Sequence, residues 1–251
     1  MSDDFAEQTV VVTGAASGIG RSQVQKFIAQ GANVIAVDRD HEGLMTLQMV
    51  VKDDRLTVLD GDVTEVATAK QAVNAAIRVG AHIDIVCNTA GVLDGYRPVM
   101  ETSIDQWQTT LNTNLTSQFL LIKQALPIML EQGHGVFVNM ASIAGLVAGG
   151  GGIAYTASKH AIIGMTKQLD ADYADQGIRA NCIAPGAIQT PMNAADFAGD
   201  GKMAQWVADQ TPAKRWAHPD EVAELTLFLA SAKADYIHGS VMTIDGGWTE
   251  K

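Results

Sequence analysis

The stretch that decides the fold is residues 9–20, which read TVVVTGAASGIG. Its first half, Thr9–Thr13, is an unbroken run of β-branched residues, typical of a strand buried on both faces of a sheet. Its second half places three glycines ahead of a helical pattern: Gly14, Gly18 and Gly20. Glycines in such a turn let the backbone approach a pyrophosphate, whose negative charge the helix N-terminus favours. The stretch therefore predicts a dinucleotide-binding turn, although an ordinary strand-to-helix turn reads similarly.

Strand-like and helix-like segments alternate along the whole chain. We expect strands at residues 9–13, 33–37, 56–59, 83–87, 136–140, 178–183 and 240–244. We expect helices up to Gln30, at 41–51, 66–79, 103–131 and 219–230, and around Tyr155 to about Asp175. Residues 187–218 should be irregular, with short helical pieces. This alternation predicts the α/β class, as a doubly wound, Rossmann-type parallel sheet of about seven strands with helices on both faces. No linker or repeat divides residues 1–251, so we expect a single domain.

Two details of this pattern allow local predictions. Pro127 and the triplet Asn112–Asn114 lie inside the helix expected at 103–131, where they should distort it. Cys87 and Cys182 each lie within an expected strand, with one strand between them. That arrangement separates them by roughly 9–10 Å, too far for a disulfide, so both should be core residues.

Composition limits the partners that the protein can have. The 251 residues are 47% hydrophobic and 18% charged, with a formal net charge of −11. Such a surface repels phosphate backbones and anionic lipid, so we expect neither nucleic acid nor membrane as a partner. The start of the chain lacks an apolar signal segment, and no apolar run approaches the about 20 residues that span a bilayer. We therefore expect a cytoplasmic protein, and the six histidines show no metal-ligand spacing.

A second constellation follows the strand expected at 136–140. Tyr155 and Lys159 are four residues apart, which stacks them on one face of a helix. A phenol with a pKa of about 10 is a poor proton donor and acceptor at neutral pH, and a cation one turn away should lower that pKa. The hydroxyl of Ser142 could polarise a carbonyl in the same site. An ordinary helix bearing a Tyr and a Lys is the alternative interpretation.

A carboxylate ends the second expected strand. Asp38 lies 20 residues after Gly18, where it can accept hydrogen bonds from both ribose hydroxyls of an adenosine. A 2′-phosphate at that position would meet a like charge, which favours NAD(H) over NADP(H). The adjacent Arg39 leaves NADP(H) possible because a guanidinium can pair with a phosphate. A solvated or Asp-paired Arg39 is the interpretation that we favour.

With these motifs in place, the chain resembles the short-chain dehydrogenase/reductase family over essentially its whole length. The segment Thr13–Gly20, with the glycine spacing GxxxGxG, is similar to the family's cofactor motif, and Asn88–Gly91 resembles its Asn-Asn-Ala-Gly motif with Thr89 as a departure. The resemblance implies four catalytic residues: Asn114, Ser142, Tyr155 and Lys159. It implies cofactor contacts from Gly14, Ser17, Gly18, Ile19, Gly20, Asp38, Arg39, Asp62, Val63, Asn88, Ala90, Gly91, Tyr155, Lys159, Pro185, Gly186, Ile188 and Thr190.

The same resemblance implies a role for each catalytic residue. Ser142 would hydrogen-bond the substrate oxygen, and Tyr155 would transfer the proton. Lys159 would bind the nicotinamide ribose and keep Tyr155 acidic as a cation, helped by the charge of the oxidised nicotinamide. Asn114 would hold a water in a proton relay. The cofactor half would be about residues 1–140, and the catalytic and lid half about 141–251.

The substrate side is less defined by the sequence. Substrate contacts are expected from Ser142, Tyr155, Leu93, Tyr96, Met192 and Phe197. Met203 and Trp206 lie in the same lid segment, and an apolar lid suits a small-molecule ketone or alcohol. Equally, these residues could cover a small core of the lid itself.

These observations favour reversible oxidation of a secondary alcohol, or reduction of a ketone, by NAD(H). Alternatives are a reductase of 3-oxoacyl groups on acyl carrier protein, a non-catalytic nicotinamide-binding regulatory protein and a Rossmann-type methyltransferase. The family's carrier-protein reductases have basic residues before the fifth strand and near the end of the catalytic helix, whereas residues 131–134 and 170–176 hold no Lys or Arg here. Lys123, Lys202, Lys214 or Arg215 could still form such a patch. The resemblance also implies a homotetramer.

Overall fold

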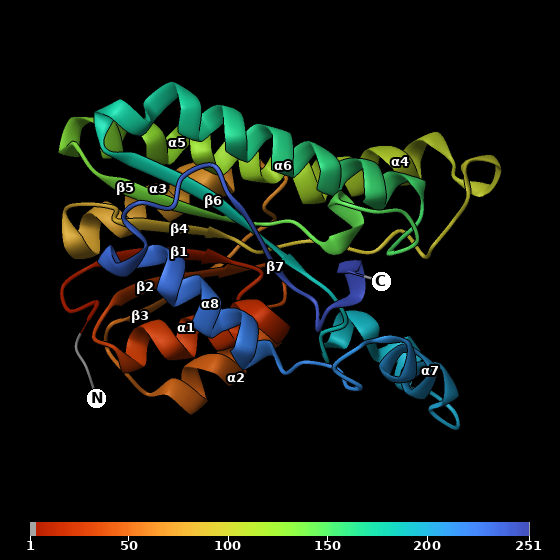
Figure 1. The fold of residues 1–251 in the computed structure, drawn as a ribbon. Coiled ribbons are helices and arrows are strands. Elements are labelled where there is room, and N and C mark those ends of the chain that lie inside the picture. Colours follow the sequence, from red (N-terminus) through yellow and green to blue (C-terminus); the bar gives the residue numbers. More distant parts are fainter. Residues whose placement is uncertain (1–3, 251) are drawn as a thin grey trace.

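The computed structural model describes residues 4–250, and its centre is a parallel sheet between two layers of helices (Figure 1). The strand order is β3-β2-β1-β4-β5-β6-β7. The strands are β1 (Thr9–Thr13), β2 (Asn33–Asp38), β3 (Leu56–Asp60), β4 (Ile85–Asn88), β5 (Gly135–Met140), β6 (Ile178–Pro185) and β7 (Val241–Ile244). The predicted doubly wound α/β fold is thereby confirmed.

Strand β1 lies inside the sheet, between β2 and β4. All five of its residues are buried, as its β-branched composition predicts. It pairs in parallel with β2 on one side and β4 on the other, so that Val10 lies opposite both Val34 and Ile85. The order of winding reverses between β1 and β4, and in such sheets ligands bind outside the carboxyl ends of the strands at that point.

The helices cover both faces of the sheet (Figure 1). On one face lie α1 (Gly18–Ala29), α2 (His41–Val51) and α8 (Pro219–Ala230), and on the other lie α3 (Val66–Gly80), α4 (Ile104–Leu111), α5 (Ser117–Gln132) and α6 (Ile153–Tyr173). Helix α7 (Lys202–Gln210) stands apart, near the carboxyl ends of the strands. Val24 and Phe27 of α1 pack with Val222 and Leu227 of α8 in one core cluster. A second cluster joins α3 and α5 to the opposite face.

The helix expected at 103–131 is interrupted, as predicted, at the asparagine triplet. Helix α4 ends at Leu111, a π-helical turn covers Asn112–Thr116, and α5 follows without a gap. Pro127 lies inside α5, which continues past it to Gln132. Single π-helical turns inside α-helices often occur at functional sites, and this one contains Asn114.

The remaining local predictions concern the cysteines and the membrane. Cys87 on β4 and Cys182 on β6 are buried and free, with β5 between them, as expected. The fourth strand begins at Ile85, two residues later than predicted, and the sixth extends to Pro185. Over residues 4–250, no helix is long and apolar enough to cross a membrane. The same part of the chain contains no group of three or more His, Cys, Asp or Glu residues that could hold a metal ion.

Candidate active site

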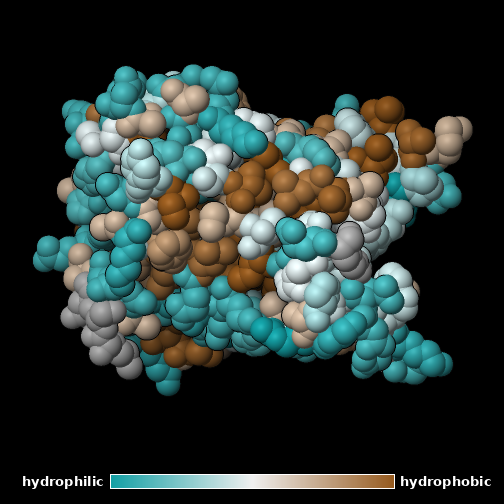
Figure 2. All heavy atoms as spheres, in the orientation of Figure 1, coloured by the Kyte–Doolittle hydropathy of each residue, from teal (hydrophilic) through white to brown (hydrophobic). Residues whose placement is uncertain are grey.

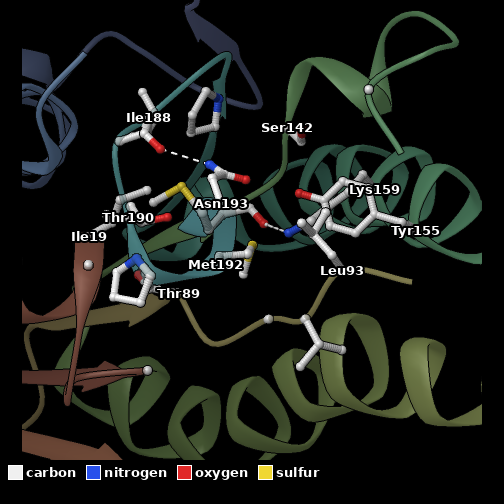
Figure 3. A pocket seen from close by; sticks show the side chains of 18 of the residues that line it. Ile19, Thr89, Leu93, Ser142, Tyr155, Lys159, Ile188, Thr190, Met192 and Asn193 are labelled. Carbon is white, nitrogen blue, oxygen red and sulfur yellow. Dashed lines mark hydrogen bonds between the residues drawn. The ribbon is translucent and has the colours of Figure 1, made fainter. Parts of the chain in front are cut away.

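A cavity of about 610 Å³ lies across the carboxyl ends of the strands. Its walls come from the turn after β1, the ends of β2 and β3, the loops after β4, β5 and β6, and helices α6 and α7. Figure 3 shows Tyr155, Lys159 and Ser142 along one side of this cavity, with Ile188 and Thr190 across from them. The parallel topology therefore gathers residues from the whole chain at one edge of the sheet.

The glycine turn after β1 is packed too closely for side chains. Gly14 has a φ of +68°, and a Cβ there would lie 2.9 Å from the Cα of Ala90. A Cβ at Gly20 would overlap the carbonyl oxygen of Gly14. No side chain caps the first turn of α1, whose N-cap residue is Ser17, and that turn contains no acidic residue. Its N–H groups therefore lie at the cavity without a side-chain partner, which suits a phosphate.

The turn is held against β4 by a threonine of β1. The hydroxyl of Thr13 accepts hydrogen bonds from the backbone N–H groups of Thr89, at 3.0 Å, and Ala90, at 3.1 Å. Thr89, which departs from the family pattern, donates its own hydroxyl to Gln23 of α1 at 2.7 Å. A small hydroxyl residue thus stabilises the junction of β4 and α1.

The carboxylate of Asp38 is fixed at the end of β2. Its Oδ2 accepts from the backbone N–H of Ala16, and its Oδ1 accepts from that of Asp40, both at 3.0 Å. Arg39 also lines the cavity but is exposed. Hydrogen bonds from Thr64 hold the pKa of Asp62 below its usual range, and the charge of Arg39 lowers it further. Arg39 therefore lies within electrostatic reach of a carboxylate.

Three buried side chains meet at the proposed reaction centre. Ser142 follows β5, while Tyr155 and Lys159 lie one turn apart on α6. The ammonium of Lys159 donates a hydrogen bond to the backbone carbonyl of Met140 at 2.8 Å. The spacing that predicts a shared helix face therefore brings these groups together.

The expected lowering of the Tyr155 pKa is wrong for the chain by itself. Burial raises the pKa of Tyr155 to about 12, and the Ser142 hydroxyl offsets only part of that rise. Burial also lowers the pKa of Lys159 to about 7. A lysine in this environment is only partly protonated at neutral pH, so its charge cannot outweigh the cost of desolvating a phenolate.

Asn114 lies behind the cavity wall. Its side chain accepts from the backbone N–H of Val92 at 2.7 Å and donates to the carbonyl of Val92 at 3.0 Å. A Cβ at Gly91 would lie 3.3 Å from Oδ1 of Asn114 and 3.7 Å from Nζ of Lys159. One position beside Gly91 thus lies within 4 Å of both side chains, so Asn114 and Lys159 lie close together on either side of this glycine.

The structure places most of the expected site residues at the cavity, with three differences. Asn88, Asn114 and Phe197 do not line it. The amide of Asn88 is buried and donates to Oδ1 of Asn139 at 2.9 Å within the sheet. Phe197 packs on Trp216 with ring centroids 4.8 Å apart, while its side chain stays exposed outside the cavity.

Other lining residues are not predicted by the sequence reasoning. They include Thr113, Ile143, Asn193, Asp196, Trp216 and Trp248. Asn193 donates to the carbonyl of Ile188 at 2.8 Å and so fixes the start of the lid (Figure 3). Two features of the sequence could have indicated these residues: the tryptophans in and after the irregular segment, and a single carboxylate, Asp196, among small and apolar residues.

Known proteins share this architecture. A family model described as enoyl-(acyl carrier protein) reductase matches residues 14–249. The chain is 39% identical to 3beta-hydroxysteroid dehydrogenase 2 of Eggerthella lenta, over 98% of this chain and 96% of that protein. It is 33% identical to cyclohexanol dehydrogenase of Acinetobacter sp., over 100% of this chain and 98% of that protein. The solved structure of a levodione reductase matches with a TM-score of 0.93 at 33% identity, covering 98% of this chain and 99% of that one.

Fold, site and relatives together define an oxidoreductase that transfers hydride between a nicotinamide cofactor and a CH–OH group. The chain belongs to the short-chain dehydrogenase/reductase family, as its motifs predict.

Proposed function

We propose that this enzyme acts with NAD(H) on a neutral secondary alcohol borne by an apolar ring, or on the corresponding ketone, with Tyr155 as proton donor and acceptor. The observation that carries the proposal is the convergence of Ser142, Tyr155 and Lys159 in a cavity with largely apolar walls. A bound nicotinamide supplies or accepts the hydride. We also propose that residues 1–251 form one domain with a cofactor half and a catalytic half.

The choice of NAD(H) rests on Asp38. Two backbone N–H groups hold its carboxylate at the cavity, where it would accept from both ribose hydroxyls and repel a 2′-phosphate. The charge of Arg39 lowers the pKa of Asp62, so a carboxylate lies within electrostatic reach of this guanidinium. The uncapped N-terminus of α1 fits a pyrophosphate.

The proton route follows from the placement of the side chains. In ketone reduction, the phenol of Tyr155 would donate its proton to the carbonyl oxygen while Ser142 donates a hydrogen bond to the same oxygen. In alcohol oxidation, the phenolate would accept that proton. Lys159 lies behind the phenol, and Asn114 lies next to Lys159, on the other side of Gly91. There the amide of Asn114 would hold a water of a proton relay.

The lining of the cavity supports an apolar, uncharged substrate. Hydrophobic walls come from Val92, Leu93, Ile143, Met192, Met203, Trp206 and Trp216. Asp196 of the lid faces the same cavity and forms no ion pair within residues 4–250. Burial raises the pKa of Asp196. A substrate carboxylate would therefore meet a like charge, whereas a hydroxyl could donate to Asp196.

The names of several relatives agree with a ring substrate. The sequence is similar to dehydrogenases named for a 3beta-hydroxysteroid and for cyclohexanol, and the fold is similar to that of a levodione reductase. A carrier-bound acyl group is the weaker candidate because three of the four cations that could dock an acidic carrier are engaged within the chain. Lys202 pairs with Asp200 and Arg215 pairs with Glu221, while Lys214 donates to the carbonyl of Asp209.

A homotetramer is the assembly that we propose. Figure 2 shows hydrophobic side chains at the surface around α4 and along the middle of the molecule. The exposed apolar residues include Met100, Ile104 of α4 and Phe119 of α5. A Cβ at Gly164 of α6 would meet nothing within 4 Å, which leaves this helix face open to close packing by another helix. Exposed apolar surface on adjacent helices supports association through this layer.

The proposed function is tested by a panel of alcohols and ketones assayed by NADH absorbance with each cofactor. We expect turnover of cyclic secondary alcohols such as cyclohexanol with NAD⁺. Tight NADH binding without turnover of any member would instead indicate a non-catalytic nicotinamide-binding protein.

A further inference from the structure

The helix that carries Tyr155 begins without a cap of its own. Its N-cap residue is Gly152, which has no side chain to accept from the first turn. The loop after β4 supplies the missing acceptors. Asp94 accepts from the backbone N–H of Gly152 at 2.8 Å through Oδ1 and from that of Tyr155 at 2.9 Å through Oδ2. The carbonyl of Arg97 accepts from the N–H of Ile153 at 3.1 Å.

The glycine run before α6 permits this contact. A Cβ at Gly152 would lie 2.5 Å from both the backbone nitrogen of Arg97 and Oδ2 of Asp94. A Cβ at Gly151 would overlap the ring of Tyr155. A side chain at Gly152 would therefore displace the loop after β4, and a side chain at Gly151 would displace the phenol of Tyr155. The run thus allows the loop after β4 to dock on the catalytic helix.

Asp94 also holds a second residue of the cavity. Its Oδ1 accepts from the backbone N–H of Tyr96 at 3.2 Å. Tyr96 lines the cavity and has a φ of +57°, a left-handed conformation that costs free energy for a residue with a Cβ. One carboxylate is therefore bonded to the backbone of both phenol residues that line the substrate cavity.

We propose that Asp94 is a positioning residue for proton transfer, which holds the start of α6 and thereby places the phenol of Tyr155. The proposal rests on the proposed role of Tyr155 as proton donor and acceptor. A carboxylate at a helix N-terminus is favourable electrostatically as well as through its hydrogen bonds. Small displacements of a reacting group lower the rate steeply, so loss of this anchor should reduce turnover more than cofactor binding.

The charge of Asp94 has a separate effect from its geometry. Within residues 4–250, four groups act on the phenol of Tyr155: Ser142 after β5, Lys159 on α6, and Tyr96 and Asp94 in the loop after β4. The charge of Asp94 contributes to the raised pKa of Tyr155. Removing the charge should therefore lower that pKa, whereas moving the charge without removing it should leave the pKa nearly unchanged.

Three variants separate these effects. Asp94→Asn removes the charge and one acceptor oxygen, and Asp94→Glu keeps the charge but displaces the carboxylate. Asp105→Asn, an exposed carboxylate at the start of α4, is the matched control. The assays are kcat for cyclohexanol oxidation as a function of pH, NADH affinity by fluorescence and thermal melting. Tyr155→Phe tests the premise under the same conditions.

We expect Asp94→Asn and Asp94→Glu each to lower kcat on the order of tenfold, with NADH affinity within twofold of wild type. The pH at which kcat rises should move lower in Asp94→Asn alone, and Asp105→Asn should match wild type. Turnover within twofold of wild type in both Asp94 variants would overturn the inference, as would an equal loss of NADH binding. If Tyr155→Phe keeps wild-type turnover, the proposed function fails with it; an inactive Tyr155→Phe beside active Asp94 variants refutes the positioning role alone.

Discussion

The ammonium of Lys159 lies 5.4 Å from the centroid of the Tyr155 ring, while its hydrogen bond to Met140 fixes it behind the phenol. Both side chains are buried. The polypeptide thus keeps a titratable cation and a titratable phenol in one desolvated site, and each is shifted toward its neutral form. Burial therefore disfavours the phenolate of Tyr155 and the ammonium of Lys159, the charged forms that the proposed proton transfer would use.

Lys159 should make stability depend on pH. Its pKa falls to about 7 in the folded chain, whereas in the unfolded chain it returns to its ordinary value near 10.4. Between these values the unfolded chain binds a proton that the folded chain does not, so the free energy of unfolding rises with pH. From pH 7 to 8.5, the wild type should gain about 1–2 kcal/mol over Lys159→Met in urea unfolding without cofactor. A difference that stays constant over this range would contradict the burial argument.

Asp38 should determine cofactor choice. We expect kcat/KM to favour NAD⁺ over NADP⁺ in the wild type. Asp38→Ala should reduce that preference by tenfold or more, because it removes both the acceptor for the ribose hydroxyls and the charge that repels a 2′-phosphate. Asp54→Ala, which removes an exposed carboxylate from the turn before β3, is the control. A wild-type preference for NADP⁺ would assign the 2′-phosphate to Arg39 instead.

Asp196 should discriminate against anionic substrates. We expect kcat/KM for cyclohexanol to exceed that for trans-4-hydroxycyclohexanecarboxylate, and Asp196→Asn to reduce this ratio several-fold, most at low salt. Asp200→Asn, an exposed lid carboxylate paired with Lys202, is a suitable control. Equal ratios in the wild type and Asp196→Asn would show that Asp196 does not face the bound substrate.

The exposed apolar surface of α4 and α5 should be covered in solution. Light scattering at micromolar concentration should give about four times the chain mass of 26.6 kDa. Phe119→Lys should reduce the assembly to smaller species, because it places a charge among apolar side chains. A monomeric mass for the wild type would contradict the proposed tetramer.

How far the sequence predicts this molecule differs from region to region. Strand β1 and the glycine turn can be predicted from the sequence, because a fully buried strand and a crowded turn each permit few residue types. The pairing of Tyr155 with Lys159 can also be predicted, because helical spacing is local. The anchoring of α6 by Asp94 cannot be predicted in this way, since its hydrogen bonds join residues 58 and 61 positions apart and no periodicity encodes them. The pKa values of the pair are likewise set by burial from several distant segments.

The lid shows the same limit. Met192, Phe197, Met203 and Trp206 are similar in sequence character, yet Phe197 packs on Trp216 while the others line the cavity. Their composition predicts an apolar lid, but which of these side chains lines the cavity depends on how an irregular segment turns. Single-residue assignments in such a segment therefore need the tertiary structure.

The most direct test of the account is the turnover of Tyr155→Phe. The substitution removes the hydroxyl that would carry the proton and leaves the glycine turn and Asp38 in place. In cyclohexanol oxidation with NAD⁺, kcat should fall a hundredfold or more, the scale of general acid–base catalysis, while fluorescence titration gives an NADH affinity close to wild type. Near-normal turnover by Tyr155→Phe would contradict the account, because the proton would then move without the hydroxyl of Tyr155.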